Sequence, residues 1–160
     1  MTKHEFITAA AEAALASSRM SSLPPGVTVA QAALESAWGR SQLARDAHNY
    51  FGIKAHGSHR LIELPTTEVV NGKAVRTSAN FAAYDSMAAC FADRDQLILK
   101  LACYADARAC SAGPLAFIRA LSRHWATDPE YAQKLIAVYT RNRLDRLDRV
   151  IGRSGDRVIS

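Results

Sequence analysis

Apolar residues recur at intervals of three and four positions over most of this chain, which is the spacing of one buried helix face. The helices that this pattern predicts cover residues 3–20, 28–38, 86–105, 113–124 and 128–147, with a short helical turn at 41–47. Thr2 with Glu5 three positions later predicts a capping box at the start of the first helix. Gly39 predicts the end of the second helix, and Asp128 followed by Pro129 predicts the start of the last one.

The pattern changes between residues 59 and 84. Ile62, Leu64 and Val75 are strand-forming residues, and the dipeptide Asn71-Gly72 is a strong signal for a tight hairpin turn. We therefore expect two or three short antiparallel strands here, inserted between helices. The chain then belongs to the α+β class, as a mostly helical domain with a small β-lobe. Two lobes of this kind typically leave a cleft between them.

The size and composition predict one soluble domain. The chain has 160 residues, of which 49% are hydrophobic and 22% are charged, the balance of an ordinary globular protein. This balance excludes a disordered tail, a collagen-like fibre and a disulfide-dense miniprotein. We place a single domain at residues 1–150, with its β-lobe at about 59–84, and a basic tail at 151–160. We expect a monomer.

Basic residues gather at the C-terminal end. The formal net charge is +5, from 20 Lys and Arg against 15 Asp and Glu. The last twenty residues hold six arginines against three aspartates, and these arginines are Arg141, Arg143, Arg146, Arg149, Arg153 and Arg157. Such a patch attracts polyanions such as nucleic acid, anionic lipid headgroups and bacterial wall polymers. No motif for groove recognition accompanies it, so we expect no specific nucleic-acid partner.

The sequence shows no targeting or membrane segment. No apolar run reaches the length of about 18 residues that a transmembrane helix needs. Glu5 and Glu12 interrupt the N-terminal stretch that a signal peptide would keep apolar. We therefore expect synthesis in the cytoplasm, without export by the general secretory route.

The cysteines and histidines predict neither a metal site nor another cofactor. Cys90, Cys103 and Cys110 lack the CxxC spacing of zinc ligands. His56 and His59 have no carboxylate partner at metal-ligand spacing. A Cys103–Cys110 or a Cys90–Cys103 disulfide stays open for an oxidising compartment.

Glu35 is the first candidate for catalysis. It belongs to an apolar, alanine-rich helix, with Gln31 four residues before it and Trp38 three residues after it. A carboxyl group at the edge of such a helix, beside an indole, is desolvated, and desolvation raises its pKa. A carboxylic acid that stays protonated near neutral pH is the proton donor that cleavage of a glycosidic bond requires.

Four blocks of sequence occur in order around and after Glu35. They read AQAALESAWGRS at 30–41, NYFGIK at 49–54, TTE at 66–68 and WATDPEYAQKL at 125–135. Together with Asn71-Gly72 and the FAAY of 81–84, these blocks resemble the glucosaminidase family of peptidoglycan hydrolases, glycoside hydrolase family 73. The resemblance covers about residues 3–140, and four ordered blocks are far more specific than any one of them.

This resemblance implies a lysozyme-like α+β fold and cleavage of the β-1,4 glycan strand of peptidoglycan after N-acetylglucosamine. It places Glu35 on the family's catalytic acid, Glu68 on its second carboxylate and Tyr131 on a tyrosine of the same cleft. Two positions depart from the family. Ala37 stands where glycine is common, which we interpret as a minor change within a helix. Trp125 stands where tyrosine is common, so an aromatic surface is kept and any hydroxyl contact is lost.

Glycoside hydrolysis needs a second carboxylate besides the acid. Glu68 lies in the predicted hairpin among polar groups, where it should stay ionised, and Glu63 and Asp85 are the alternatives. A β-lobe held by few strands can move, so Glu35 and Glu68 can lie far apart without substrate. Inverting and acetamido-assisted mechanisms therefore both stay open.

Aromatic side chains are the usual platforms for the C–H faces of sugar rings. The candidate platforms are Phe51, Tyr84, Trp125 and Tyr131. Each of them can instead pack in the core. Asn49 is a candidate to hydrogen-bond an acetamido group, with a role as a turn residue as the alternative.

These observations predict a peptidoglycan hydrolase, an endo-β-N-acetylglucosaminidase that acts as a phage or prophage endolysin. We expect it to reach the wall in the periplasm after the membrane has been opened. Its expected partners are glycan strands, with a further contact of the C-terminal arginines to the anionic cell envelope. One alternative is a muramidase or a lytic transglycosylase on the same polymer, since enzymes with one fold can cleave a polymer at different bonds. The other is a catalytically inactive wall-binding module.

Overall fold

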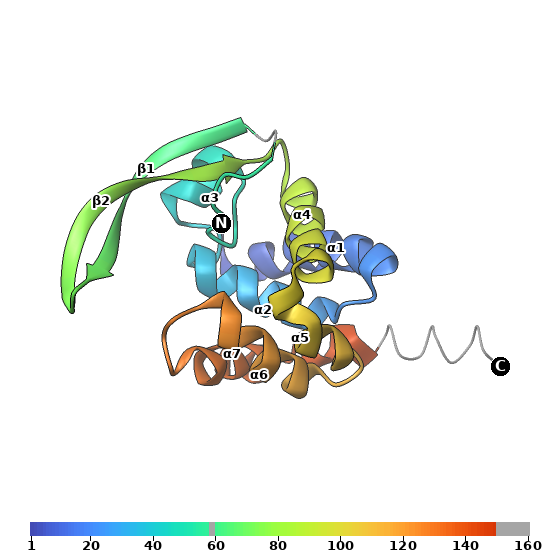
Figure 1. The fold of residues 1–160 in the computed structure, drawn as a ribbon. Coiled ribbons are helices and arrows are strands. Elements are labelled where there is room, and N and C mark those ends of the chain that lie inside the picture. The colour runs from blue at the N-terminus through green and yellow to red at the C-terminus, as the bar shows by residue number, and fades with distance from the viewer. Residues whose placement is uncertain (58–59, 150–160) are drawn as a thin grey trace.

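Figure 1 shows a body of helices from which a long two-stranded hairpin arches away. The computed structural model describes residues 1–57 and 60–149. The helices are α1 (Lys3–Ser21), α2 (Pro25–Ser36), α3 (Gln42–Ala47), α4 (Met87–Lys100), the 3₁₀ helix η1 (Ala102–Tyr104), α5 (Ala105–Ala109), α6 (Pro114–Trp125) and α7 (Tyr131–Arg141). The strands are β1 (Arg60–Val70) and β2 (Lys73–Ala83). The predicted α+β class, mostly helical with an inserted antiparallel β-lobe, is confirmed.

The first helix has the predicted capping box. Thr2 accepts a hydrogen bond from the Glu5 N–H, and the Glu5 side chain accepts one from the Thr2 N–H. The second helix differs from the prediction at both ends. It begins at Pro25, before the expected residue 28, because proline fits the first turn of a helix. It ends at Ser36, before the expected residue 38, because the backbone turns left-handed directly afterwards.

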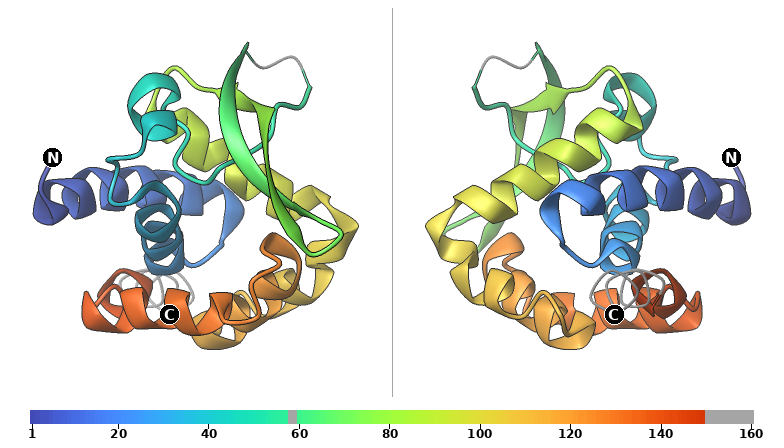
Figure 2. Two further views of the ribbon diagram at one scale, coloured as in Figure 1. Left: turned by 90° about the vertical axis from the view of Figure 1, so that its left-hand side faces the viewer. Right: turned by 90° about the vertical axis from the view of Figure 1, so that its right-hand side faces the viewer.

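The helix α2 runs through the middle of the molecule. Figure 2 shows it between α1 and α7, and most of its residues are buried. A helix that is covered on nearly all sides is apolar nearly all round. Glu35 is the only charged residue in α2, so its position is unusual for the helix that carries it.

The β-lobe is one long hairpin instead of two or three short strands. Each strand has 11 residues, and they pair in antiparallel register from Arg60 opposite Ala83 to Val70 opposite Lys73. The turn is formed by Asn71-Gly72, with φ of 52° and 78° at the two residues, which are the left-handed conformations that a type I′ turn needs. The strands exceed the expected length because their backbone pairing continues along the exposed outer half of the hairpin.

The expected helix at 86–105 is divided. It ends as α4 at Lys100, because Leu101 adopts an extended conformation with φ −76° and ψ 132°, and η1 and α5 follow. The next predicted helix, at 113–124, agrees closely with α6. The division turns the chain around the end of α4, where a cavity described below is found.

The last predicted helix, at 128–147, is also shorter than expected. It begins as α7 at Tyr131, because Asp128 caps the preceding turn instead of the helix, through a 2.9 Å hydrogen bond from the Glu130 N–H to its carboxylate. It ends before Arg143, which has a φ of 53°. A positive φ interrupts a right-handed helix.

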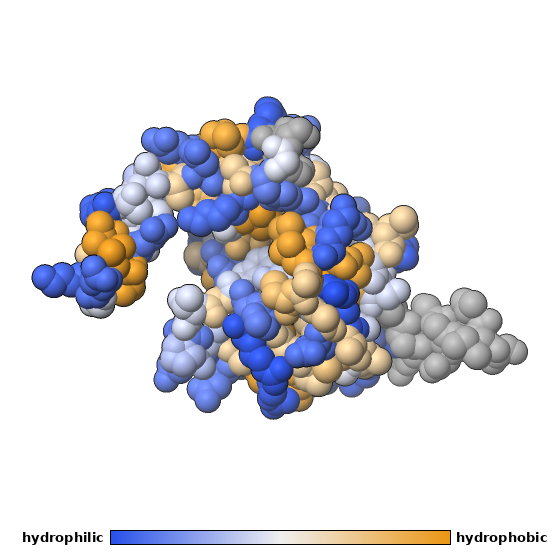
Figure 3. Space-filling view, viewed as in Figure 1, coloured by the Kyte–Doolittle hydropathy of each residue, from blue (hydrophilic) through white to orange (hydrophobic). Residues whose placement is uncertain are grey.

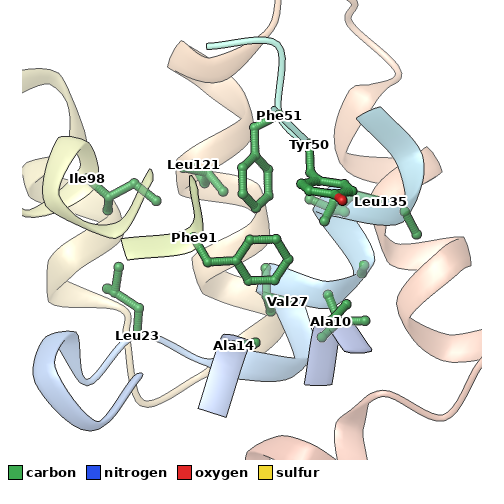
Figure 4. Close-up of a cluster of buried hydrophobic side chains, with 14 of the residues drawn as sticks. Ala10, Ala14, Leu23, Val27, Tyr50, Phe51, Phe91, Ile98, Leu121 and Leu135 are labelled. Carbon is green, nitrogen blue, oxygen red and sulfur yellow. The ribbon is translucent and has the colours of Figure 1, made fainter. Parts of the chain in front are cut away.

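The core joins the segment after α3 to the helices. Figure 4 shows Phe51 and Phe91 side by side in the buried cluster, with their ring centroids 5.1 Å apart. The ring of Tyr50 meets that of Phe91 edge-on, with the centroids 6.1 Å apart. These aromatic contacts hold the segment after α3 against α4, and this segment forms one wall of the cavity.

The three cysteines are free thiols. Cys90 is buried, and burial raises the pKa of its thiol to about 12. Cys103 is exposed and Cys110 is half-buried. Neither of the two disulfides left open by the sequence is formed.

Several sequence predictions concern parts that the structure does not describe. His59 and the basic tail at 151–160, with Arg153 and Arg157, lie outside the described residues. Within residues 1–57 and 60–149, no helix is long and apolar enough to cross a membrane. The same residues contain no group of three or more His, Cys, Asp or Glu side chains that could hold a metal ion.

Candidate active site

Glu35 lies in the last turn of α2 and lines a cavity of about 500 Å³. Burial raises the pKa of Glu35 above its ordinary value, and a hydrogen bond from Tyr131 opposes this rise. The direction of the shift agrees with the sequence prediction, and it favours the protonated form that a general acid needs.

The indole that shares the cavity with Glu35 belongs to Trp125, not to Trp38. Trp38 lies beyond the end of α2 with a φ of 60°, and it packs edge-on against Phe6 with the ring centroids 6.0 Å apart. The ammonium group of Lys3 lies 4.7 Å from the Trp38 ring centroid. The helical spacing that predicted Trp38 beside Glu35 fails because α2 ends between the two residues.

Tyr131 holds the Glu35 carboxyl group in place. It is the first residue of α7 and is buried, and its hydroxyl donates to Glu35 Oε1 at 2.6 Å. Burial and the neighbouring Glu35 carboxyl raise the pKa of Tyr131 above its ordinary value, so Tyr131 remains a hydrogen-bond donor. The fold therefore brings together two residues that are 96 positions apart in the chain.

The walls of the cavity come from residues 51–56, the end of α4, η1 and the end of α6. Phe51 and Trp125, two of the predicted sugar platforms, both line it, with their ring centroids 6.2 Å apart. Tyr104 also lines it and lies 6.1 Å from Trp125. Sequence reasoning missed Tyr104, because no motif surrounds it and its position depends on the turn after α4.

Glu68 lies on the hairpin, and it does not line this cavity. It follows Ile62, Leu64 and Thr66 at two-residue spacing, and these are the partly buried positions of β1. Alternate residues of a strand share a face, so Glu68 belongs to the face that turns toward the body. Its carboxylate lies 3.9 Å from the ammonium group of Lys54, which lines the cavity. The side chain is 54% exposed.

The two alternative carboxylates lie at positions that differ from that of Glu68. Glu63 lies at an exposed position of β1, one residue out of phase with Glu68, and therefore on the opposite face of the hairpin. Asp85 follows β2, is 87% exposed, and forms an ion pair with Arg60. Figure 3 shows the hairpin standing away from the helical body, with open space between its tip and the helices.

Asn49 has a structural role that differs from the predicted contact with an acetamido group. It is buried, and its amide nitrogen donates to the Ile53 and Ala82 carbonyls, both at 2.9 Å. Its side-chain oxygen accepts from the N–H groups of Phe51 and Ile53. Both amide hydrogens are therefore used to shape the turn at 49–53 and to attach it to β2.

Tyr84 also differs from its predicted role as a sugar platform. Its ring is buried and does not line the cavity, and its hydroxyl donates to Asp93. The same Asp93 oxygen lies 2.8 Å from His56 Nε2, and His56 does line the cavity. Tyr84 therefore supports the cavity wall through Asp93 and His56 instead of offering a surface to a sugar.

Comparison with known proteins decides the family. A family model described as glucosaminidase, mannosyl-glycoprotein endo-beta-N-acetylglucosaminidase, matches residues 11–144. The chain belongs to the glucosaminidase family. It is 32% identical over 140 residues to the peptidoglycan hydrolase FlgJ of Salmonella typhimurium, covering 84% of this chain and 44% of that protein. It is 34% identical over 131 residues to the exo-glucosaminidase LytG of Bacillus subtilis, covering 79% of this chain and 46% of that protein.

A solved structure supports the same family. The catalytic domain of the autolysin Auto from Listeria monocytogenes is 30% identical and matches with a TM-score of 0.82, covering 91% of this chain and 87% of that domain. This chain spans less than half the length of each of the two curated relatives, FlgJ and LytG. The family predicted from four blocks of sequence is confirmed.

The interpretation of Ala37 as a minor change within a helix is wrong. Ala37 caps the end of α2 with φ 50° and ψ 51°, and this left-handed conformation costs a residue with a Cβ atom about 1–2 kcal/mol. Glycine, which the sequence resemblance implies at this position, avoids most of that cost. The departure therefore stores strain two residues after Glu35.

Proposed function

We propose that this chain is a peptidoglycan hydrolase that cleaves the β-1,4 glycan strand, with Glu35 as the general acid. The observation that carries the proposal is the carboxyl group of raised pKa in an aromatic-lined cavity, held by the Tyr131 hydroxyl at 2.6 Å. A buried carboxylic acid is rare unless it is used or paired, and no charged partner neutralises Glu35 among the described residues. Membership of the glucosaminidase family supports the same chemistry.

In this mechanism Glu35 transfers its proton to the glycosidic oxygen as the bond breaks. The hydrogen bond from Tyr131 then stabilises the carboxylate that is left, because a donor binds an ionised oxygen more strongly than a neutral one. Glu68 either activates a water molecule or stabilises positive charge at the anomeric carbon. We propose that the hairpin closes over the bound strand and carries Glu68 toward the cavity, which Lys54 already lines.

We further propose that the cut follows N-acetylglucosamine and is made within the strand. The family description names an endo-beta-N-acetylglucosaminidase, which supports both parts of this proposal, whereas LytG, named an exo-glucosaminidase, supports only the sugar at the cut. The segment between Phe51 and His56 and the Trp125 ring line the cavity, and the half-buried Trp125 ring offers a face on which a sugar can lie.

The test is digestion of purified peptidoglycan, followed by borohydride reduction and mass spectrometry of the fragments. We expect reduced N-acetylglucosamine ends on internal fragments from the wild type. Reduced muramic acid ends would instead show a muramidase, and anhydromuramic ends a lytic transglycosylase. A folded wild-type protein that cleaves nothing would leave a wall-binding module.

The acid is tested in the same assay by Glu35→Gln. Loss of a general acid lowers turnover by about 10²- to 10⁴-fold, and the amide can still accept the hydrogen bond from Tyr131. The matched control is Glu12→Gln, at an exposed position of α1, which should cleave like the wild type. Turnover by Glu35→Gln near the wild-type rate would contradict the assigned role.

The exposed arginines at the end of α7 and just after it support a second contact with the anionic cell envelope. Arg141, Arg143 and Arg146 are all exposed, and opposite charges attract such a patch to wall polymers and lipid headgroups. Changing these three residues to serine should weaken binding to purified envelopes at low salt and leave cleavage of soluble fragments unchanged. The same change at the exposed Arg19, Arg40 and Arg45 is the control for net charge. Equal effects of both triple variants would contradict a specific contact.

We also propose that the enzyme acts as an endolysin, from the periplasmic side, once the membrane has been opened. The support is chemical, because the proposed substrate lies outside the cytoplasmic membrane. Cells that express the chain should lyse only when a membrane-permeabilising agent is added. Lysis without such an agent would contradict this proposal.

A further inference from the structure

Arg94 is a fully buried arginine in the middle of the domain, with 0% of its surface exposed. It lies on the inward face of α4 together with Phe91 and Ile98. A buried guanidinium group is costly unless its donors are paired. Its nearest charge is Asp95, whose Oδ1 accepts from Arg94 Nη1 at 2.8 Å, and the Thr28 hydroxyl accepts from the same nitrogen at 2.9 Å.

The remaining donors of Arg94 converge on one atom of α2. Arg94 Nε and Nη2 both donate to Gln31 Oε1, at 3.0 and 2.8 Å. Gln31 is fully buried, and its Nε2 donates to the Tyr131 hydroxyl oxygen at 3.3 Å. Tyr131 in turn donates to Glu35 Oε1 at 2.6 Å. A continuous chain of hydrogen bonds therefore runs from Arg94 to the proposed acid.

The direction of every hydrogen bond in this chain follows from Arg94. A guanidinium group only donates, so it must face the oxygen of the Gln31 amide and not its NH₂ group. The NH₂ group is then turned toward Tyr131, whose oxygen must accept. A phenol has one hydrogen to donate. The NH₂ group of Gln31 cannot accept it, whereas Glu35 Oε1 lies 2.6 Å away and can, so that hydrogen is directed to Glu35 Oε1.

This direction has a consequence for Glu35. An oxygen that accepts from Tyr131 is the carbonyl-like oxygen of the protonated carboxyl group, so the acidic hydrogen is carried by the other oxygen, Oε2. Without Gln31 and Arg94, the Tyr131 hydroxyl could rotate and accept a hydrogen bond from Glu35 instead. The acidic hydrogen of Glu35 would then be bonded to the tyrosine oxygen and would not be free for the substrate.

We propose that Arg94 and Gln31 are positioning residues for the acid, which orient the Tyr131 hydroxyl so that it donates to Glu35 Oε1 and leaves the transferable hydrogen on Oε2. This inference rests on the proposed function of Glu35. The charged groups around the chain are Asp95 beside Arg94 on α4, and Lys54 and His56 in the segment that lines the cavity. The orientation of the Tyr131 hydroxyl comes from its two hydrogen bonds, one accepted from Gln31 Nε2 and one donated to Glu35 Oε1.

The sharpest variant is Gln31→Glu. It keeps the size of the side chain and an acceptor for Arg94, so the buried guanidinium stays paired and the fold is retained. It removes the donor to Tyr131 and supplies a second carboxylate that competes for the tyrosine hydrogen. We expect kcat to fall about 10-fold or more with KM nearly unchanged, and the alkaline limb of the pH profile to move upward by at least about half a pH unit, because Glu35 loses its donor and gains a negative neighbour.

Two further variants distinguish a positioning role of Gln31 from a structural role and from an effect of net charge. Gln96→Glu makes the same change at an exposed site of α4 and controls for net charge. Gln31→Met removes the donor without adding charge, and it should move the alkaline limb in the same direction by a smaller amount. When Gln31→Met is added to Tyr131→Phe, the alkaline limb of the pH profile should stay where it is in Tyr131→Phe alone, because Gln31 acts through Tyr131.

The titration of Glu35 is read directly by ¹³C NMR of its side-chain carboxyl group in each folded variant. An upward shift in Gln31→Glu and Gln31→Met, with none in Gln96→Glu, supports the proposal. Unchanged titration in a folded Gln31→Glu protein would overturn it, even if the wild type cleaves peptidoglycan. If the titration shifts and the wild type cleaves nothing, the orientation of Tyr131 is established and the proposed function fails.

Discussion

Glu35 is carried by a helix that is buried on nearly all sides, whereas Glu68 is carried by the exposed outer half of a two-stranded hairpin. The first carboxyl group is held by Tyr131 in a chain of directed hydrogen bonds, and burial raises its pKa. The second is 54% exposed and lies 3.9 Å from the ammonium group of Lys54. An acid needs a fixed, poorly solvated position, whereas a residue that acts after the substrate binds can reside on a part that moves.

The largest expected effect concerns the second carboxylate. Glu68→Gln should lower turnover by about 10²-fold or more, because the charge that activates water or stabilises the anomeric carbon is lost. Its melting temperature should equal that of the wild type, since the side chain is exposed and its ion pair is weak. The measurement is release of reducing ends from purified peptidoglycan.

The matched controls for this prediction are Glu63→Gln on the opposite face of β1 and Asp85→Asn beyond β2. Both should keep most of the activity. A severe loss in either one, with an active Glu68→Gln, would assign the second carboxylate to that residue.

A smaller effect is expected from the hairpin turn. Gly72→Ala places a Cβ atom where nothing lies within 4 Å, so the cost comes from the φ of 78° alone, at about 1 kcal/mol. Because Glu68 lies close to this turn, turnover should fall a few-fold, while the melting temperature of the helical body changes little. Gly113→Ala, which meets only ordinary contacts at 3.8 Å, should keep full activity. Identical turnover in both variants would show that the hairpin turn does not influence catalysis.

The environment of Glu35 also predicts a pH-dependent stability. Folding raises the pKa of Glu35 above its ordinary value of 4.5, so its protonated form stabilises the folded state and this contribution is lost as the pH rises through the folded-state pKa. Glu35→Gln does not titrate. Its melting temperature relative to the wild type should therefore increase between about pH 4 and about pH 8, as measured by calorimetry at each pH. A difference that decreases over this range would contradict the raised pKa, and Glu12→Gln provides the baseline.

The smallest effect is expected at the end of α2. Ala37→Gly should stabilise the protein by about 0.5–1 kcal/mol, because relief of the left-handed strain exceeds the added flexibility of the unfolded chain. For a chain of this size that is a rise in melting temperature of roughly 1–4 °C. Lower stability of Ala37→Gly would show that Ala37 is not strained.

Sequence patterns predicted correctly those features that depend on residues close together in the chain. The capping box at Thr2, the turn at Asn71-Gly72 and the class of the fold follow from neighbouring residues. The boundaries of α2 and α7 were predicted less well, because they depend on left-handed residues at Ala37 and Arg143 that the periodicity does not reveal. Arg94 was missed, although an arginine at helical spacing from Phe91 and Ile98 on an inward face is a signal that could have found it.

The sequence by itself determined which helix carries Glu35, that this helix is apolar, and that ordered blocks place the chain in the glucosaminidase family. These properties depend on residues close together in the chain or on their order. Only the tertiary structure decided that Tyr131 donates to Glu35, that Arg94 orients this contact through Gln31, and that Asn49 and Tyr84 support the cavity instead of lining it. The physical reason is that a hydrogen bond depends on position and direction in space, and residues far apart in the chain acquire both only when the helices pack.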